Sequence, residues 1–95
     1  MAAYVIYQGE VTDPERYDVY KTHAASSIER AGGRYVVRGG PVEPLEGEEP
    51  AGRTVVIEFP TMDAALAWYH GDEYTAARTL REGAARCHMY VVDGV

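Results

Sequence analysis

Short runs of strand-forming residues alternate along the chain with segments whose apolar residues recur at helical spacing. Strands are predicted where β-branched and aromatic residues gather, over Ala3–Val11, Arg34–Arg38, Arg53–Phe59 and residues 87–92. Helices are predicted between them, over residues 13–31, over residues 62–69 and from about residue 73 to residue 84. The alternation predicts an α+β fold in a single domain spanning residues 1–95.

The first helix has two candidate starts that lie one residue apart. Asp13 can cap the helix with Pro14 at the first helical position, or Thr12 can cap it with Glu15 closing a capping box. The glycine pair at residues 32–33 is predicted to end this helix, because glycine adopts the left-handed terminal conformation without strain. In the second helical region, residues 70–72 read His-Gly-Asp and predict a break.

The segment between the second and third predicted strands is acidic and rich in turn residues. Residues 39–52 contain three prolines and four glutamates. Such a composition predicts a connection rather than a regular element, with a short extended piece at residues 42–45.

The predicted order of elements, β-α-β-β-α-β, is that of the ferredoxin-like fold. Right-handed crossovers place both helical regions on one face of a four-stranded antiparallel sheet. The other face would alternate with polar residues if water covered it, yet Ile6, Val56, Tyr90 and Val92 all point to it. We therefore predict that a second copy covers this face, giving a two-fold homodimer through the sheet.

Composition and charge limit the kinds of partner that the chain can bind and the cellular compartment in which we expect it. The net charge of −6 argues against unaided binding of nucleic acid, and no apolar run approaches the ~20 residues of a membrane span. The N-terminus lacks the basic and apolar regions of a signal peptide, so we expect a cytoplasmic protein without membrane association. Cys87 is the only cysteine, which excludes an intrachain disulfide. Eight tyrosines accompany one phenylalanine and one tryptophan, an unusual balance.

Segments distributed over the whole chain resemble a small bacterial family catalogued as domain of unknown function 1330. The resemblance rests on Thr12-Asp13-Pro14-Glu15, Gly32-Gly33-Arg34-Tyr35, Arg38-Gly39-Gly40, Leu45-Glu46-Gly47, Val55-Val56-Ile57-Glu58-Phe59-Pro60, Ala67-Trp68-Tyr69, Glu73-Tyr74 and Leu80-Arg81. It implies a ferredoxin-like homodimer of the dimeric α/β-barrel superfamily. Relatives in that superfamily include cofactor-independent monooxygenases, heme-degrading enzymes, polyketide cyclases and muconolactone isomerases. Where the family often has Asn-Ser-Pro-Glu-Tyr, this chain has His-Gly-Asp-Glu-Tyr at residues 70–74, which weakens the start of the last helix.

Glu58 is the first candidate for chemistry, because a carboxylate within an apolar strand is costly unless it is paired. One interpretation is an ion pair with Arg38, Arg34 or Arg81. The other is a general acid or base with a raised pKa in a cavity.

His23 is the second candidate for proton transfer. It lies one step from the apolar face of the first helix and is either a solvated helix residue or a base lining a pocket. The three histidines are scattered without the spacing of metal ligands. We therefore predict no metal and no cofactor.

Guanidinium and aromatic side chains are the candidates for holding a ligand. Arg38 and Arg81 can bind a carboxylate or phosphate, and Trp68 and Tyr74 can stack on an aromatic ring. The hydroxyls of Tyr17, Tyr20, Tyr35 and Tyr74 can surround a cavity. The commoner roles of these types, salt bridges and core packing, remain the alternative.

Two functions stay open from the sequence. In the first, the chain binds a small organic acid or aromatic metabolite between sheet and helices and is a cofactor-independent enzyme of the monooxygenase, isomerase or cyclase type. In the second, it is a non-catalytic homodimer that binds a metabolite or has a structural role. Convergence of Glu58, Arg38 and His23 around a void would favour the enzyme.

Overall fold

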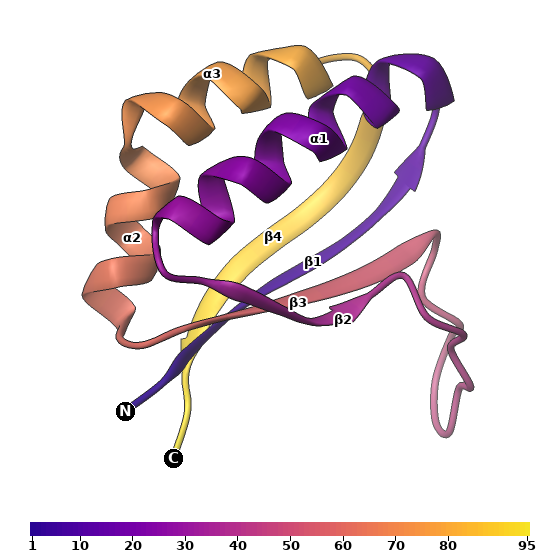
Figure 1. Ribbon diagram of the computed structural model, residues 1–95. Helices are drawn as coiled ribbons and strands as arrows, with labels where there is room; N and C mark the ends of the chain where they lie inside the picture. Colours follow the sequence, from indigo (N-terminus) through magenta and orange to yellow (C-terminus); the bar gives the residue numbers. More distant parts are fainter.

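The computed structural model describes all 95 residues and contains four strands and three helices (Figure 1). In chain order the elements are β1 (Ala3–Val11), α1 (Pro14–Arg30), β2 (Arg34–Arg38), β3 (Arg53–Phe59), α2 (Met62–His70), α3 (Asp72–Arg81) and β4 (Ala85–Asp93). The strands form one sheet in the order β2-β3-β1-β4, and every neighbouring pair is antiparallel. The ferredoxin-like fold predicted from the sequence is therefore confirmed, with α2 and α3 in the place of one helix.

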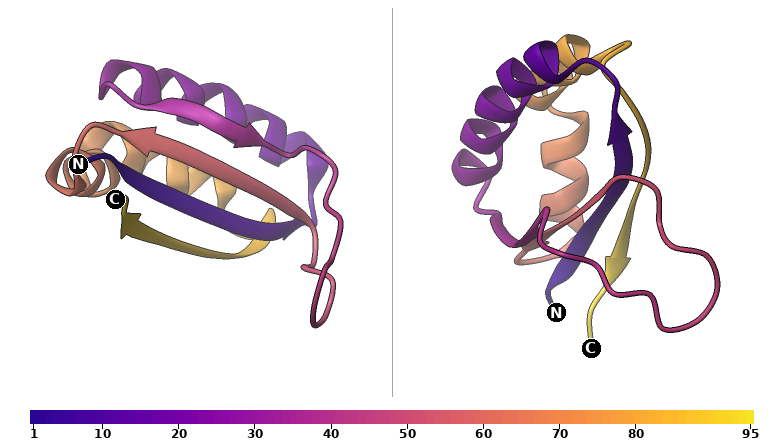
Figure 2. Two further views of the ribbon diagram at one scale, coloured as in Figure 1. Left: turned by 90° about the horizontal axis from the view of Figure 1, so that it is seen from below. Right: turned by 90° about the vertical axis from the view of Figure 1, so that its right-hand side faces the viewer.

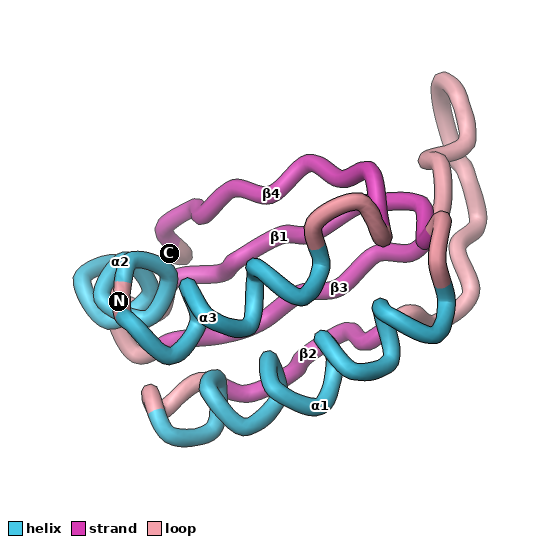
Figure 3. Tube along the Cα trace, turned by 90° about the horizontal axis from the view of Figure 1, so that it is seen from above, coloured by secondary structure: helices cyan, strands magenta, loops and turns pink.

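All three helices lie on one face of the sheet, and α1 packs alongside α3 (Figure 3). The core lies between these layers and is built from alternate strand residues and one stripe of each helix. Phe59 and Tyr74 are its largest fully buried side chains. None of the helices combines the length and apolar character needed to cross a membrane.

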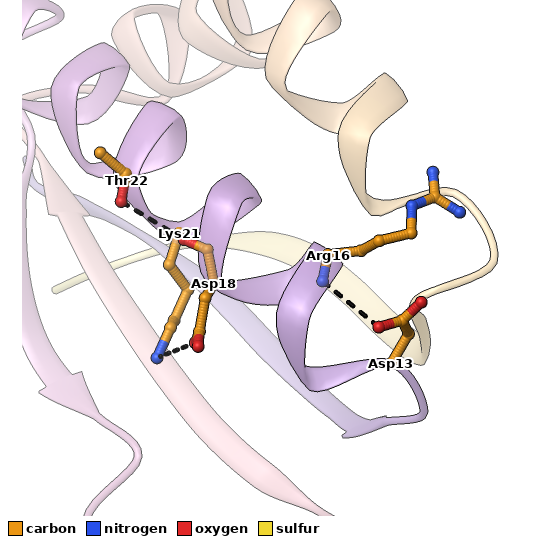
Figure 4. Close-up of polar contacts among 5 residues, drawn as sticks. All are labelled: Asp13, Arg16, Asp18, Lys21 and Thr22. Carbon is orange, nitrogen blue, oxygen red and sulfur yellow. Dashed lines mark hydrogen bonds and ion pairs between the residues drawn. The ribbon is translucent and has the colours of Figure 1, made fainter.

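The start of α1 is determined by Asp13, the first of the two predicted caps. Its side chain accepts a hydrogen bond of 3.3 Å from the backbone N–H of Arg16, with Pro14 in the first turn (Figure 4). One turn further along, Lys21 forms an ion pair of 3.2 Å with Asp18 (Figure 4). Thr12 instead donates its hydroxyl to the carbonyl oxygen of Gly83, which ties this corner to the end of α3.

The structure corrects two predictions, the end of the last helix and the extended piece at residues 42–45. The last helix ends at Arg81 rather than at residue 84, because Gly83 adopts a φ of +75° that an α-helix does not continue through. Residues 42–45 form no strand. They belong to the connection between β2 and β3, which projects away from the helices (Figure 2).

The face of the sheet opposite the helices carries an apolar row that crosses all four strands. Val37 of β2 pairs with Val56 of β3, Val56 pairs with Ile6 of β1, and Ile6 pairs with Tyr90 of β4. We call these four residues the apolar stripe. No part of the chain packs over the stripe, and Tyr90 at its end is 59% exposed.

Candidate functional site

Four tyrosines meet between the sheet and the helices. Tyr7 comes from β1, Tyr17 and Tyr20 from α1, and Tyr74 from α3, and all four are buried. Their rings contact one another edge to face, with centroids 6.4 Å apart for Tyr7–Tyr17, 5.3 Å for Tyr17–Tyr20 and 6.3 Å for Tyr20–Tyr74. The hydroxyls of Tyr20 and Tyr74 share a hydrogen bond of 2.7 Å.

The guanidinium of Arg81 lies against these rings from the last turn of α3. Its Cζ is 5.7 Å from the ring centroid of Tyr7 and 5.2 Å from that of Tyr20, which is cation–π range. The Nη1 atom of Arg81 and the hydroxyl of Tyr7 are both buried without a hydrogen-bond partner. None of the chain's three ion pairs involves Arg81. Arg81 and the four tyrosines, here called the Arg81–tyrosine cluster, thus contain a partly buried cation with one unpaired, buried nitrogen and an unused hydroxyl, but no carboxylate.

Burial determines the protonation state of the cluster. It raises the pKa values of Tyr7, Tyr20 and Tyr74 above the usual phenol value, so these hydroxyls keep their protons at neutral pH. The pKa of Arg81 is raised as well, although burial alone would lower it. Arg81 is therefore charged, and the cluster presents positive charge and O–H donors to any group that enters it.

A cleft of about 250 Å³ lies between α2 and the edge strand β4, next to the cluster. Its walls are mainly apolar and include Leu66, Trp68 and Tyr69 of α2 and Met89 and Val91 of β4. We call it the α2–β4 cleft. Its size and apolar lining suit a small ring or a short hydrocarbon body.

Tyr74 and Met89 separate this cleft from the charged cluster. The ring of Tyr74 packs 4.1 Å from that of Trp68 on the cleft side and bonds to Tyr20 on the cluster side. Met89 pairs with Tyr7 across the strands. Its side chain lines both the cleft and a void of about 30 Å³ that is bounded by Tyr7 and Tyr20. Met89 thus borders both the cleft and the void, while Arg81 lines neither of them.

Comparisons with known proteins place the chain in a family. The sequence model of a family described as "Domain of unknown function (DUF1330)" matches residues 2–95. The chain belongs to this family. No curated protein matches it.

Solved structures resemble this DUF1330 chain in fold at low sequence identity. A protein of unknown function from Rhodopseudomonas palustris, RPA0582, aligns with a TM-score of 0.77 at 16% identity, over 99% of this chain and 82% of that one. SnoaB, a cofactor-independent oxygenase from Streptomyces nogalater, gives 0.70 at 12%, over 99% and 93%. A dimeric ferredoxin-like protein of unknown function from Bacteroides fragilis gives 0.58 at 12%, over 98% and 96%.

The ligand-holding residues predicted from the sequence fall into two groups in this DUF1330 chain. Arg81, Tyr20 and Tyr74 come together in the cluster, and Trp68 walls the adjacent cleft. Arg38 lies at the far side of the small void, with its Cζ 4.2 Å above the ring of Tyr35.

The two residues predicted to move protons lie outside the cluster. Glu58 lies on the face of the sheet opposite the helices, where it accepts hydrogen bonds from Arg34 Nε at 2.6 Å and from the Tyr4 hydroxyl at 3.2 Å. His23 is exposed on α1, beside a recess towards α3. Glu58, His23 and Arg38 therefore do not converge, and of the proposed partners of Glu58 the structure selects Arg34.

Two residues of the site were not predicted from the sequence. Strand alternation puts Tyr7 on the same face of β1 as Val5, and a hydroxyl in that helix-facing row is the signal available from the sequence. Met89 gave no signal, because its position between two cavities depends on how α1 and α2 pack. No group of three or more His, Cys, Asp or Glu side chains is placed to hold a metal ion.

Proposed function

We propose that this protein binds a small organic acid with an aromatic or apolar body. The body occupies the α2–β4 cleft, and the acid group reaches the Arg81 guanidinium and the Tyr7 hydroxyl past Met89. Methionine has three rotatable bonds and a soft thioether, so its side chain can move aside for the ligand.

The unpaired, buried Nη1 of Arg81 carries this proposal. A buried charge destabilises a protein unless it is paired, and the nearest groups here are neutral phenols that donate hydrogen bonds. An anionic oxygen entering the cluster would satisfy Arg81 and Tyr7 together, at a point where water competes weakly.

The test is binding of 1-naphthoate, an aromatic acid, followed by fluorescence or calorimetry. Replacing Arg81 by Met should weaken binding about 10- to 100-fold, since a hydrogen bond to a charged group contributes about 1.5–3 kcal/mol. The matched control is Arg16→Met on the exposed start of α1, and the matched ligand is uncharged 1-naphthalenemethanol. Equal affinity of wild type and Arg81→Met for naphthoate would overturn the proposal.

We further propose that two copies associate through the open face of the sheet. The apolar stripe supports this, because large exposed apolar patches are rare on monomers. The dimeric neighbour from Bacteroides fragilis shares the fold. Sedimentation velocity at micromolar concentration should give a dimer, and a monomer under those conditions contradicts it.

The arrangement supports ligand binding better than acid–base catalysis. The cofactor-independent enzyme predicted from the sequence relied on Glu58 or His23 to move a proton, and neither lies in the cluster. The likeness to SnoaB, at 12% identity, is a likeness of fold.

A further inference from the structure

Tyr90 belongs to two surfaces at once. In the sheet it pairs with Ile6 and ends the apolar stripe on the open face. It also lines the α2–β4 cleft, on the helix side of the sheet. Both are possible for one residue because β4 is an edge strand, so its residues border the open face as well as the space between the sheet and α2.

The stripe and the cleft therefore meet at Tyr90. The stripe runs from Val37 across the sheet to Tyr90, and the cleft begins at the same residue and includes Leu66, which is 40% exposed. Whatever covers the Tyr90 end of the stripe also borders the mouth of the cleft.

We infer that the second copy in the dimer completes the mouth of the ligand cleft at Tyr90, so that ligand binding and dimerisation strengthen each other. The inference rests on both parts of the proposed function. By linkage, a ligand that binds the dimer more tightly than the monomer stabilises the dimer by the same free energy per site.

Opposite charges flank the apolar stripe on the open face. The chain carries a net charge of −6, which opposes self-association in general. On the open face, however, Arg34 pairs with Glu58 on one side of the stripe, and Arg86 lies opposite Glu10 on the other. The two pairs beside the stripe are thus neutral, while Glu48 and Glu49 of the β2–β3 connection border the end of the face that carries Glu10 and Arg86.

The dimensions of the chain also suit a face-to-face dimer. It measures 34 × 32 × 16 Å along its principal axes, a flat shape with one uncovered broad face. Such a face can supply the roughly 800 Å² per partner of a standard interface.

Sedimentation and probe titration on the full chain test the coupling. Sedimentation velocity measures the dimer dissociation constant without and with saturating 1-naphthoate, which is the probe. Titration then measures the affinity for 1-naphthoate at protein concentrations above and below that dissociation constant. A coupling of roughly tenfold per site should tighten the dimer roughly hundredfold, because each dimer has two sites.

Three variants test the apolar stripe and the ligand site independently. Val56→Asp and Val37→Glu place a charge in the stripe away from the cleft, and the second lies on the edge strand β2, where the fold tolerates it more easily. Both should be monomeric and should bind naphthoate roughly tenfold more weakly, although neither residue touches the cleft. Arg81→Met should bind 1-naphthoate about 10- to 100-fold more weakly, while its dimer without naphthoate stays at wild-type strength.

Each outcome leads to a different conclusion. A folded, monomeric Val56→Asp or Val37→Glu that binds naphthoate as tightly as wild type overturns the inference but leaves the ligand site standing. A wild-type dimer that does not tighten with bound probe also overturns it. A wild-type dimer that binds no naphthoate refutes the proposed ligand site, and with it the inference.

Discussion

The indole Nε1–H of Trp68 donates a hydrogen bond of 3.0 Å to the hydroxyl of Ser27, and this bond joins α2 to α1 inside the core. Ser27 in turn donates its own proton to the carbonyl oxygen of Ala24 at 2.8 Å. Ser27 is only 2% exposed and is the one polar residue among the buried ones outside the tyrosines and tryptophan. The hydroxyl therefore satisfies the only donor of the largest aromatic side chain in the site.

Replacing Ser27 by Ala should lower the free energy of unfolding by about 1–3 kcal/mol, because the Trp68 Nε1–H is left buried without an acceptor. Chemical denaturation measures this directly. The control is Ser26→Ala, one residue earlier and exposed on α1, which should stay within about 0.5 kcal/mol of wild type. Equal stability of the two variants would show that the indole finds another acceptor.

Gly52 should tolerate no side chain. Its φ is +76°, and a Cβ there would lie 1.8 Å from the carbonyl oxygen of Gly9 in β1. Gly47 has a similar φ of +77° but open space around it. Gly47→Ala should therefore cost about 1–2 kcal/mol from backbone strain alone, and Gly52→Ala roughly 3 kcal/mol or more. Similar losses for both in thermal denaturation would contradict the close approach to β1.

Alkaline pH should destabilise the fold through the buried phenols. The pKa of Tyr20 is raised above 10.0 by burial, so the unfolded chain loses this proton first as the pH increases. The stabilisation is complete below pH 10 and falls by about 1.4 kcal/mol per pH unit for each such phenol above it. Urea denaturation at pH 8 and pH 11 should show the loss, and Tyr20→Phe should show a smaller one. An equal loss in the variant would contradict the assignment to Tyr20.

The sequence predicted the sheet, the helices and their order because each depends on local pattern. Glycine and proline mark the ends of elements, and alternation in β1 and β3 already separated Val5 and Tyr7 from Tyr4 and Ile6. The confirmed order then determined that one face lacks helices. The end of α3 was harder to predict, because Gly83 stops the helix through its backbone conformation, which the pattern of apolar residues does not show.

The site was predicted in part, because the type of a residue indicates its chemistry but not where its side chain points in the fold. Arg81, Tyr20 and Tyr74 were chosen for their groups and do converge. Glu58 has equally suggestive chemistry, but the two-residue period of a strand turns it to the open face, where Arg34 from β2 reaches it. Which arginine meets which carboxylate depends on strand register and helix packing, which no local pattern contains.

Removing the charge of Arg81 should leave the protein at least as stable in the absence of ligand. The Nη1 atom of Arg81 is buried without an anion, although the residue as a whole is only partly buried, and replacement of an unpaired buried charge by an apolar side chain is neutral or stabilising. Arg81→Met should therefore match or exceed the wild-type free energy of unfolding, whereas Phe59→Ala should lose about 3–5 kcal/mol. A large loss of unfolding free energy in Arg81→Met would show that Arg81 stabilises the fold by packing against its neighbours.

Shortening Met89 should lengthen the ligand site. Its side chain divides the α2–β4 cleft from the void beside Tyr7 and Tyr20, so Met89→Ala joins the two spaces. The variant should bind 4-biphenylcarboxylate about tenfold more tightly than wild type does, since one or two methylene groups in an apolar pocket change affinity 10-fold or more.

The matched control is Val91→Ala, the next helix-facing residue of β4, which lines the cleft but not the void. It should weaken 1-naphthoate binding without any gain for the longer acid. Met89→Ala should also lose about 2 kcal/mol of stability, at the lower end for such truncations because Met89 is only half-buried. An equal change in affinity for the short and long acids in both variants would show that Met89 is an ordinary wall residue and that the two compartments are separate.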